Sequence, residues 1–213
     1  NSLAQSVNVT SVKTLYLAGL DNVLKNAAKL GITTFTDRYR YGLSLVLGGG
    51  EVRLIELVGA YSVLAQEGIR HPQRFVQRVE TSDGIVFEES SDAPEEVVDP
   101  QYPRIINDIL SDIDARRPLF SASLDRTIFP GHQVALKTGT TNDYRDAWAM
   151  GYTRSLVVGV WAGNNNNEPM QRRGGSILAA VPIWSDFMRE ALKTRTLEPF
   201  TRPEPIITQK PVL

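Results

Sequence analysis

The sequence predicts an α+β fold, in which an antiparallel sheet is flanked by helices. Helical patterns fill the first part of the chain, three strand-like runs follow Gly131, and a further helical pattern comes after them. Short turns between the three runs favour an antiparallel meander, which the helices are expected to cover in layers. Because helices precede and follow the strands, we expect one domain over residues 1–198. The proline-rich residues 199–213 are expected to form an extended exit segment.

The helices of the first part are predicted from apolar periodicity and from their terminal residues. A short apolar helix is expected over 11–18, and Asp21 is a suitable N-cap for a second helix over 22–30. The strongest pattern covers 53–66, where apolar residues recur at helical spacing and Gly68 lies beyond the end.

A hairpin and an acidic stretch occupy the middle of the chain. Residues 74–80 and 85–89 are typical of strands, and Ser-Asp-Gly at 82–84 is a good turn between them. Residues 88–99 hold six acidic residues and no basic ones. We interpret this stretch as a solvated loop; the alternative is an acidic docking patch.

The second half contains two more helices and the meander. Asp99 and Pro100 suit the start of a helix that Pro118 is expected to end, and Pro182 is expected to start the last helix. The three strands of the meander are expected at 133–138, 145–152 and 156–162.

Composition excludes several classes of function. The 213 residues carry a net charge of −1, with no basic stripe to neutralise phosphates, so nucleic acid is not the expected partner. The chain has no cysteine, which excludes disulfides and thiolate chemistry. His71 and His132 have no second ligand at helical spacing, so neither a metal nor a cofactor is expected. The chain opens on Asn1 in mid-pattern, and we expect it to be a piece of a longer protein.

The most informative motif is Lys137-Thr138-Gly139-Thr140-Thr141, at the end of an apolar run. A lysine, small hydroxyl residues and a glycine that permits close approach suit an edge strand that binds a carboxylate. Lys-Thr-Gly is also one of three signatures of penicillin-binding proteins and serine β-lactamases, although the tripeptide alone is only suggestive.

A second motif, Ser6-Val7-Asn8, immediately precedes the first predicted helix. Ser6 and Asn8 could both point at one ligand if the backbone turns there. The alternative is that they form an ordinary N-terminal cap.

In this order and spacing, the motifs resemble the transpeptidase domain of class A penicillin-binding proteins, the bifunctional enzymes that polymerise and cross-link peptidoglycan. The resemblance runs through most of the chain. Its matching segments are 6–9, 30–32, 47–52, 60–65, 137–141, 144–148, 151–153, 159–164 and 182–184. It implies the fold shared by penicillin-binding proteins and serine β-lactamases, incomplete here on its N-terminal side.

The resemblance implies roles for several residues. Ser6 would relay a proton, and Asn8 would hold the substrate amide. Lys137 would supply positive charge near the substrate carboxylate. Hydroxyls of Thr138 and Thr140 would bind that carboxylate, the Thr140 N–H would be one oxyanion donor, and Gly139 permits close approach. Thr141 completes the expected substrate-binding set.

The family's nucleophilic Ser-x-x-Lys motif lies upstream of Ser-x-Asn and is not found at that place. Thr10-Ser11-Val12-Lys13 comes after Ser6-Val7-Asn8, so neither Thr10 nor Ser11 is expected to be the nucleophile. The chain is therefore expected to be inactive alone, and the upstream part or a second chain is expected to complete it.

The function implied is peptidoglycan D,D-transpeptidation by serine acyl transfer, with covalent binding of penicillin; the parent protein would also be a glycosyltransferase. The expected partners are D-Ala-D-Ala stem peptides and β-lactams. The expected location is the periplasmic face of the bacterial inner membrane, with the anchor absent here. The alternatives are a serine β-lactamase and a non-catalytic muropeptide-binding module.

Other residues are given structural interpretations. The three glycines at 48–50 are expected to form a tight turn before a helix. Arg145 and Asp146 are expected to form an ion pair that stabilises the meander. Trp148 and Trp161 are expected in the core, although Trp161 could border a cleft.

Overall fold

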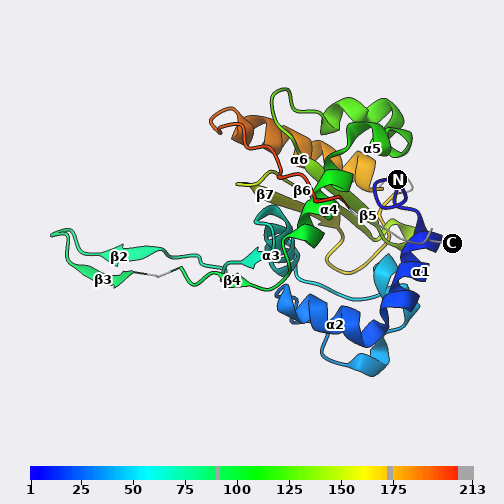
Figure 1. Ribbon diagram of the computed structural model, residues 1–213, viewed down its shortest axis with the longest axis horizontal. Coiled ribbons are helices and arrows are strands. Elements are labelled where there is room, and N and C mark those ends of the chain that lie inside the picture. The colour runs from blue at the N-terminus through cyan, green and yellow to red at the C-terminus, as the bar shows by residue number, and fades with distance from the viewer. Residues whose placement is uncertain (90–91, 172–174, 206–213) are drawn as a thin grey trace.

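The computed structural model describes residues 1–89, 92–171 and 175–205. At its centre is a three-stranded antiparallel sheet in the order β5-β6-β7, with helices on both faces (Figure 1). The α-helices are α1 (Asn8–Ala18), α2 (Leu20–Lys29), α3 (Leu54–Ala65), α4 (Gln101–Ser111), α5 (Ile113–Phe120) and α6 (Ser176–Leu192). The strands are β1 (Ile69–Arg70), β2 (Arg78–Glu80), β3 (Val86–Glu89), β4 (Glu95–Glu96), β5 (Ala135–Thr140), β6 (Asp146–Tyr152) and β7 (Val157–Gly163). Short 3-10 helices are η1 (Arg38–Arg40), η2 (Leu43–Leu47), η3 (Ser121–Thr127) and η4 (Asn142–Tyr144).

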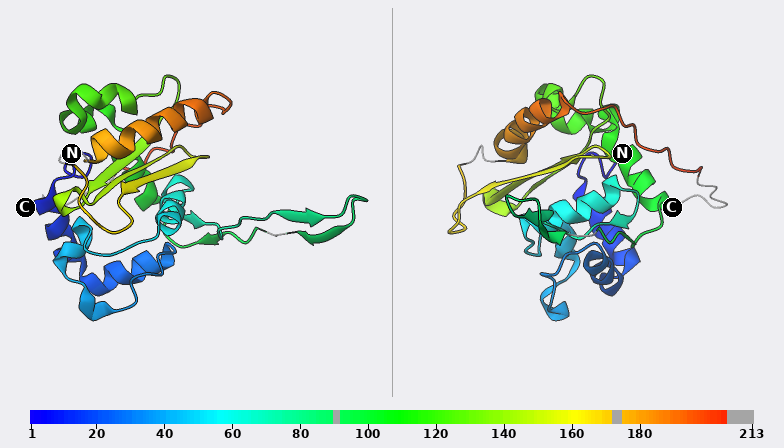
Figure 2. Two further views of the ribbon diagram at one scale, coloured as in Figure 1. Left: turned by 180° about the vertical axis from the view of Figure 1, so that it is seen from behind. Right: turned by 90° about the vertical axis from the view of Figure 1, so that its left-hand side faces the viewer.

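The predicted α+β class and the antiparallel meander are confirmed. Residues on β5 alternate between the two faces of the sheet. Leu136 joins a core built with α6, which includes the fully buried Trp184. Ala135 belongs to the opposite core, where it lies with Ala65 of α3 and Leu110 of α4. The sheet is therefore a layer between α6 on one side and α3 with α4 on the other (Figures 1 and 2).

Two glycines let the helices approach this sheet closely. A Cβ on Gly151 of β6 would lie 2.1 Å from a ring carbon of Trp184 in α6. A Cβ on Gly159 of β7 would lie 2.6 Å from Val58 in α3, on the other face. Both distances are far below van der Waals contact, so each helix packs directly on backbone.

The predicted hairpin is confirmed, with strands shorter than expected. β2 and β3 pair antiparallel and project away from the body as an arm (Figures 1 and 2). At its base β1 pairs with β4, so the expectation of a loop throughout 88–99 is wrong. Residues 69–70 and 95–96 hydrogen-bond to each other through their main chains, whereas the main chain of a solvated loop bonds mainly to water. Residues 90 and 91 lie outside the described residues, and the docking-patch alternative stays a prediction.

Pro118 and Pro182, which were expected at helix ends, lie inside helices instead. The helix that begins after Asp99 ends at Ser111, because the carboxylate of Asp112 accepts the Ala115 N–H at 2.9 Å and caps α5. Pro118 lies in the last turn of α5, where it removes one hydrogen bond without ending the helix.

The last helix begins at Ser176 and includes Pro182. Ala180 and Val181, both fully buried, pack in the α6 core, and this burial offsets the hydrogen bond that proline cannot make. The N-cap of α2 was also misplaced: it is Gly19, while Asp21 lies in the first turn, where its charge favours the helix N-terminus.

Residues 199–205 form no helix or strand, as expected for an extended segment, but they pack on the body. Phe200 is buried against Tyr152, with ring centroids 5.7 Å apart, and the Thr201 hydroxyl donates to Glu67. Residues 206–213 lie outside the described residues, and the boundary after residue 198 stays a prediction. None of the helices described has the length and apolar character needed to cross a membrane.

Candidate active site

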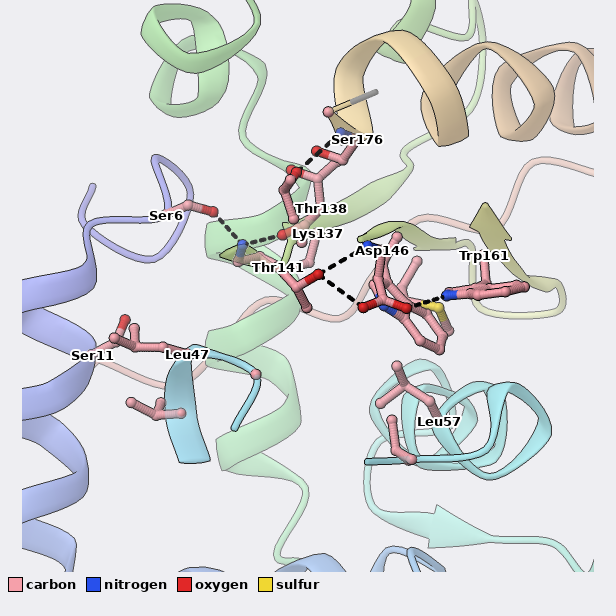
Figure 3. A pocket seen from close by; sticks show the side chains of 18 of the residues that line it. Ser6, Ser11, Leu47, Leu57, Lys137, Thr138, Thr141, Asp146, Trp161 and Ser176 are labelled. Carbon is pink, nitrogen blue, oxygen red and sulfur yellow. Dashed lines mark hydrogen bonds between the residues drawn. The ribbon is translucent and has the colours of Figure 1, made fainter. Parts of the chain in front are cut away.

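A cleft of about 1450 Å³ lies along the free edge of β5. Its walls come from the loop before α1, from η2 and the glycines after it, from α3, and from the start of α6 (Figure 3). All seven predicted site residues line it: Ser6, Asn8, Lys137, Thr138, Gly139, Thr140 and Thr141. The fold thus brings together two motifs that are 131 positions apart in the chain.

Lys137 and Ser6 point toward each other across the cleft (Figure 3). The ammonium donates to the Ser6 hydroxyl and, at 2.6 Å, to the carbonyl of Thr138. Burial lowers the pKa of Lys137 from 10.5 to about 8, because desolvation disfavours the charged form. This amine is therefore still mostly protonated at pH 7, yet close enough to neutrality to exchange a proton.

A tight turn places Ser6 at the cleft. Its backbone is left-handed, with φ of 55°, and the N–H of Val7 closes the turn on the carbonyl of Ser2 at 3.0 Å. Val7 is the N-cap of α1, and no side chain caps this helix. The alternative that Ser6 and Asn8 serve as a cap is therefore wrong. Asn8, the first residue of α1, lies exposed in the cleft wall.

The register of β5 decides which of its backbone groups face the cleft. The N–H of Thr141 donates to the carbonyl of Asp146 across the ladder, at 3.1 Å. Main-chain groups alternate along an antiparallel strand, so those of Thr140 and Thr138 point to the unpaired edge. The Thr140 hydroxyl also accepts the N–H of Ser176 at 3.0 Å, and no acceptor among the described residues takes its own proton.

The hydroxyl of Thr141, unlike that of Thr140, both donates and accepts a hydrogen bond within the protein. It donates to Asp146 Oδ2 at 2.8 Å and accepts the Asp146 N–H at 2.9 Å, so its proton is already used. The other carboxylate oxygen of Asp146 accepts the indole N–H of Trp161 at 2.8 Å. The predicted ion pair with Arg145 is wrong: that guanidinium donates to the Asn167 carbonyl and approaches Asp143 at 3.9 Å. Adjacency in sequence was misleading here, because Arg145 precedes β6 with a helical backbone, and its side chain bonds to the Asn167 carbonyl instead.

Three residues with expected structural roles, Gly48, Trp148 and Trp161, also line the cleft. Gly48, with φ of 97°, turns the chain after η2 as expected, but it also lies against the end of β5. A Cβ on it would come within 3.7 Å of Thr141 Cγ2. Trp148 is half-buried and lines the cleft with Trp161, so the expectation that both are core residues is wrong; the alternative for Trp161 is confirmed. The register aligns Gly139, Trp148 and Trp161 across the sheet.

Sequence reasoning missed Asp146 and the apolar wall formed by Leu47 and Leu57 (Figure 3). Residues 144–148 belong to the family resemblance, but nothing in their sequence shows that the aspartate bonds to the Thr141 hydroxyl and to Trp161 of β7. Within the described part of the chain, no group of three or more His, Asp or Glu side chains is placed to hold a metal ion.

Comparisons with known proteins agree with this geometry. The family model for the penicillin-binding protein transpeptidase domain matches residues 1–189. Penicillin-binding protein 1A of Aquifex aeolicus is 32% identical over 203 residues, which cover 95% of this chain and 27% of that protein. Penicillin-binding protein 1A of Mycobacterium tuberculosis is 34% identical over 169 residues, 75% of this chain and 20% of that protein.

Solved structures give the same result. The PonA1 protein of M. tuberculosis in complex with penicillin V has a TM-score of 0.82 at 26% identity, covering 96% of this chain and 59% of that one. Penicillin-binding protein 1A of Haemophilus influenzae shares the fold, with a TM-score of 0.81 at 20% identity over 95% of this chain and 35% of that one. The chain spans about a quarter of the length of the curated relatives. By its family match over residues 1–189, the chain belongs to the penicillin-binding protein transpeptidase domain family.

Proposed function

We propose that this chain is the C-terminal part of a peptidoglycan D,D-transpeptidase, which cross-links stem peptides by serine acyl transfer. The observation that carries the proposal is the contact between Lys137 and Ser6 at the free edge of β5. A half-buried ammonium, a serine hydroxyl and outward-facing main-chain donors then share one cleft. Acyl transfer needs these groups: a proton relay, a carboxylate-binding charge and an oxyanion donor.

Each site residue has a specific role in this proposal. Ser6, bonded to Lys137, relays a proton to the departing D-alanine, and Asn8 holds the substrate amide. Lys137 attracts the carboxylate of the D-Ala-D-Ala terminus. Thr138 and Thr140 bind that carboxylate, and the outward N–H of Thr140 is one oxyanion donor.

Gly139 and Thr141 shape the same strand. A side chain at Gly139 would stand over the Trp148 side of the cleft, where a Cβ would lie 3.7 Å from that residue's Cβ. The proton of the Thr141 hydroxyl is already donated to Asp146, so Thr141 contributes by lining the cleft rather than by donating to substrate.

We place the nucleophile outside this sequence, in an upstream Ser-x-x-Lys motif. Two hydroxyls near the cleft are poor candidates, because Ser11 and Thr10 both donate to the Val7 carbonyl within α1, at 3.2 and 3.3 Å. A carbonyl cannot take up the proton that a nucleophile must lose. The segment that carries the motif would complete the domain.

The wider setting is part of the same proposal. The substrates are D-Ala-D-Ala stem peptides, and β-lactams are covalent inhibitors, as the penicillin V complex of PonA1 supports. The site would face the periplasm, with the anchor and a glycosyltransferase domain in other parts of the protein. A serine β-lactamase or a non-catalytic muropeptide-binding module is the competing function.

The test is intact-mass detection of a penicillin adduct on this chain and on an upstream-extended version. We expect an adduct only on the extended protein, and slow decay of that adduct. Rapid decay would favour the β-lactamase, and reversible muropeptide binding without any adduct would favour the module. An adduct on the short chain, mapped to Ser6 by peptide mass spectrometry, would show that Ser6 is the nucleophile and that the upstream placement is wrong.

A further inference from the structure

Asp146 lies in the cleft wall at the first residue of β6, and the roles proposed above do not use its carboxylate. One carboxylate oxygen accepts the hydroxyl of Thr141 and the other accepts the indole N–H of Trp161, each at 2.8 Å (Figure 3). Its own N–H returns a bond to Thr141 Oγ1 at 2.9 Å. The carboxylate therefore joins the end of β5 to β6 and β7.

The connection that Asp146 closes is conformationally demanding. Asp143 and Tyr144, between β5 and β6, both have left-handed backbones, with φ of 58° and 56°. Non-glycine residues rarely adopt this region and keep it only where the surroundings fix them. The pair formed by Thr141 and Asp146 lies across the base of this turn, immediately after Thr140.

Asp146 does not act on Lys137 as a charge partner. No ion pair joins the two side chains among the described residues, and burial is what lowers the lysine's pKa. Both carboxylate oxygens are occupied by neutral donors. Its effect on the site must therefore pass through geometry.

We propose that Asp146 is a positioning residue of the transpeptidase: it holds the end of β5 so that the N–H and hydroxyl of Thr140 face the reacting group, and it fixes Trp161 as a cleft wall. This inference rests on the proposed function. Reaction rates depend steeply on such placement, since a misplacement of about 1 Å can cost about 100-fold.

Substitutions at Asp146 and Thr141 test the hydrogen bonds between these two residues. Asp146→Asn keeps the size of the side chain but turns an amide N–H₂ toward one of the two donors. Thr141→Val removes only the hydroxyl, and Thr141→Ser keeps it. The matched control is Asp143→Asn, in the same connection, where an exposed carboxylate only approaches Arg145 at 3.9 Å. Asparagine also tolerates the φ of 58° found there.

The experiment measures acylation by penicillin in the full-length protein, separating the reversible binding constant from the acylation rate constant. We expect Asp146→Asn and Thr141→Val to lower the rate constant about 10- to 100-fold, with a smaller change in reversible binding. Asp143→Asn should stay near wild type, and Thr141→Ser, which keeps the hydroxyl, should acylate faster than Thr141→Val. The double variant Asp146→Asn/Thr141→Val should be no slower than the slower single variant, because the residues act as one unit.

An Asp146→Asn protein that acylates like Asp143→Asn overturns the inference, even if its melting temperature falls, because the role is then only structural. If Asp146→Asn does not fold, the two Thr141 variants decide: a Thr141→Val protein that acylates more slowly than Thr141→Ser supports positioning, and equal rates for the two refute it. A wild-type protein that forms no adduct removes the proposed function itself, and the inference with it.

Discussion

Lys137 is expected to lower the stability of the folded protein at pH 7. Burial lowers its pKa from 10.5 to about 8, and that difference corresponds to a cost of about 3 kcal/mol for holding the charge in the folded protein at pH 7. Lys137→Met removes the charge but keeps an unbranched side chain of similar length. Because the cleft is open to solvent, water can replace the lost donor to Ser6 and Thr138. We therefore expect Lys137→Met to stabilise the protein at pH 7 by about 1–3 kcal/mol.

The two pKa values of Lys137, folded and unfolded, determine how stability changes with pH. The unfolded chain keeps the lysine proton up to about pH 10.5, whereas the folded chain releases it near pH 8. Between these values the unfolded state binds more protons, so the stability of the wild type rises with pH. The advantage of Lys137→Met should therefore be full below pH 8 and fade as the pH rises toward 10.5.

Thermal unfolding of the intact protein at several pH values checks both expectations. A gain of 1 kcal/mol should raise the melting temperature of a domain of about this size by about 2–4 °C. Exposed Lys25→Met on α2 is the matched control and should change little at any pH. Acylation by penicillin should fall at least about 100-fold in Lys137→Met, as for other lost electrostatic groups. A Lys137→Met protein that is less stable at pH 7, or whose gain does not depend on pH, would refute the reasoning.

Three further substitutions test other parts of the structure. Gly151→Ala should lower the free energy of unfolding by about 1–3 kcal/mol through overpacking, because its Cβ would meet Trp184 at 2.1 Å. Denaturant titration measures this change, and Gly42→Ala, which has open space around it, is the control. Although burial pushes the pKa of Glu67 upward, hydrogen bonds from Thr201 and Arg104 and the charges of Arg104 and Arg154 lower it overall. Its stabilising contribution should therefore be lost as pH falls below about 4.5, and melting curves of Glu67→Gln should lack that acid dependence. Thr140→Val should slow acylation about 10-fold or more, because it removes the hydroxyl proton that would bind substrate. It should also lower the free energy of unfolding by about 1 kcal/mol, because the Ser176 N–H loses its acceptor. A normal acylation rate would exclude the hydroxyl from the mechanism.

The sheet and the longer helices could be predicted because their signals are local. The strong apolar spacing of α3 and the short turns between β5, β6 and β7 depend only on neighbouring residues. The motif at 137–141 was likewise expected on an edge strand, and β5 is an edge of the observed sheet. Helix boundaries at Pro118 and Pro182 were misjudged because tertiary packing there outweighs the local preference of proline.

The contacts of the candidate site depend on long-range geometry and were only partly predictable. The family resemblance predicted that Ser6, Asn8 and the Lys137 strand share one site, but it did not predict the bond between Lys137 and Ser6. It also gave no sign that Asp146 would bond to Thr141 and Trp161 rather than to Arg145. Such partners follow from strand register and face, which composition and spacing do not determine.

Strand register also explains why the motif must lie on an edge. Cross-strand pairing places Lys137 and Gly139 on the face of Met150 and Trp148, toward α3. Thr138 and Thr140 are on the opposite face, where Thr140 meets the start of α6. In a central strand, side chains on opposite faces could not contact one ligand, and the main chain between them would be paired on both sides. At the free edge of β5, a ligand can reach side chains from both faces and the unpaired N–H of Thr140. A register shift of one residue would exchange these faces and put Lys137 against the apolar α6 core.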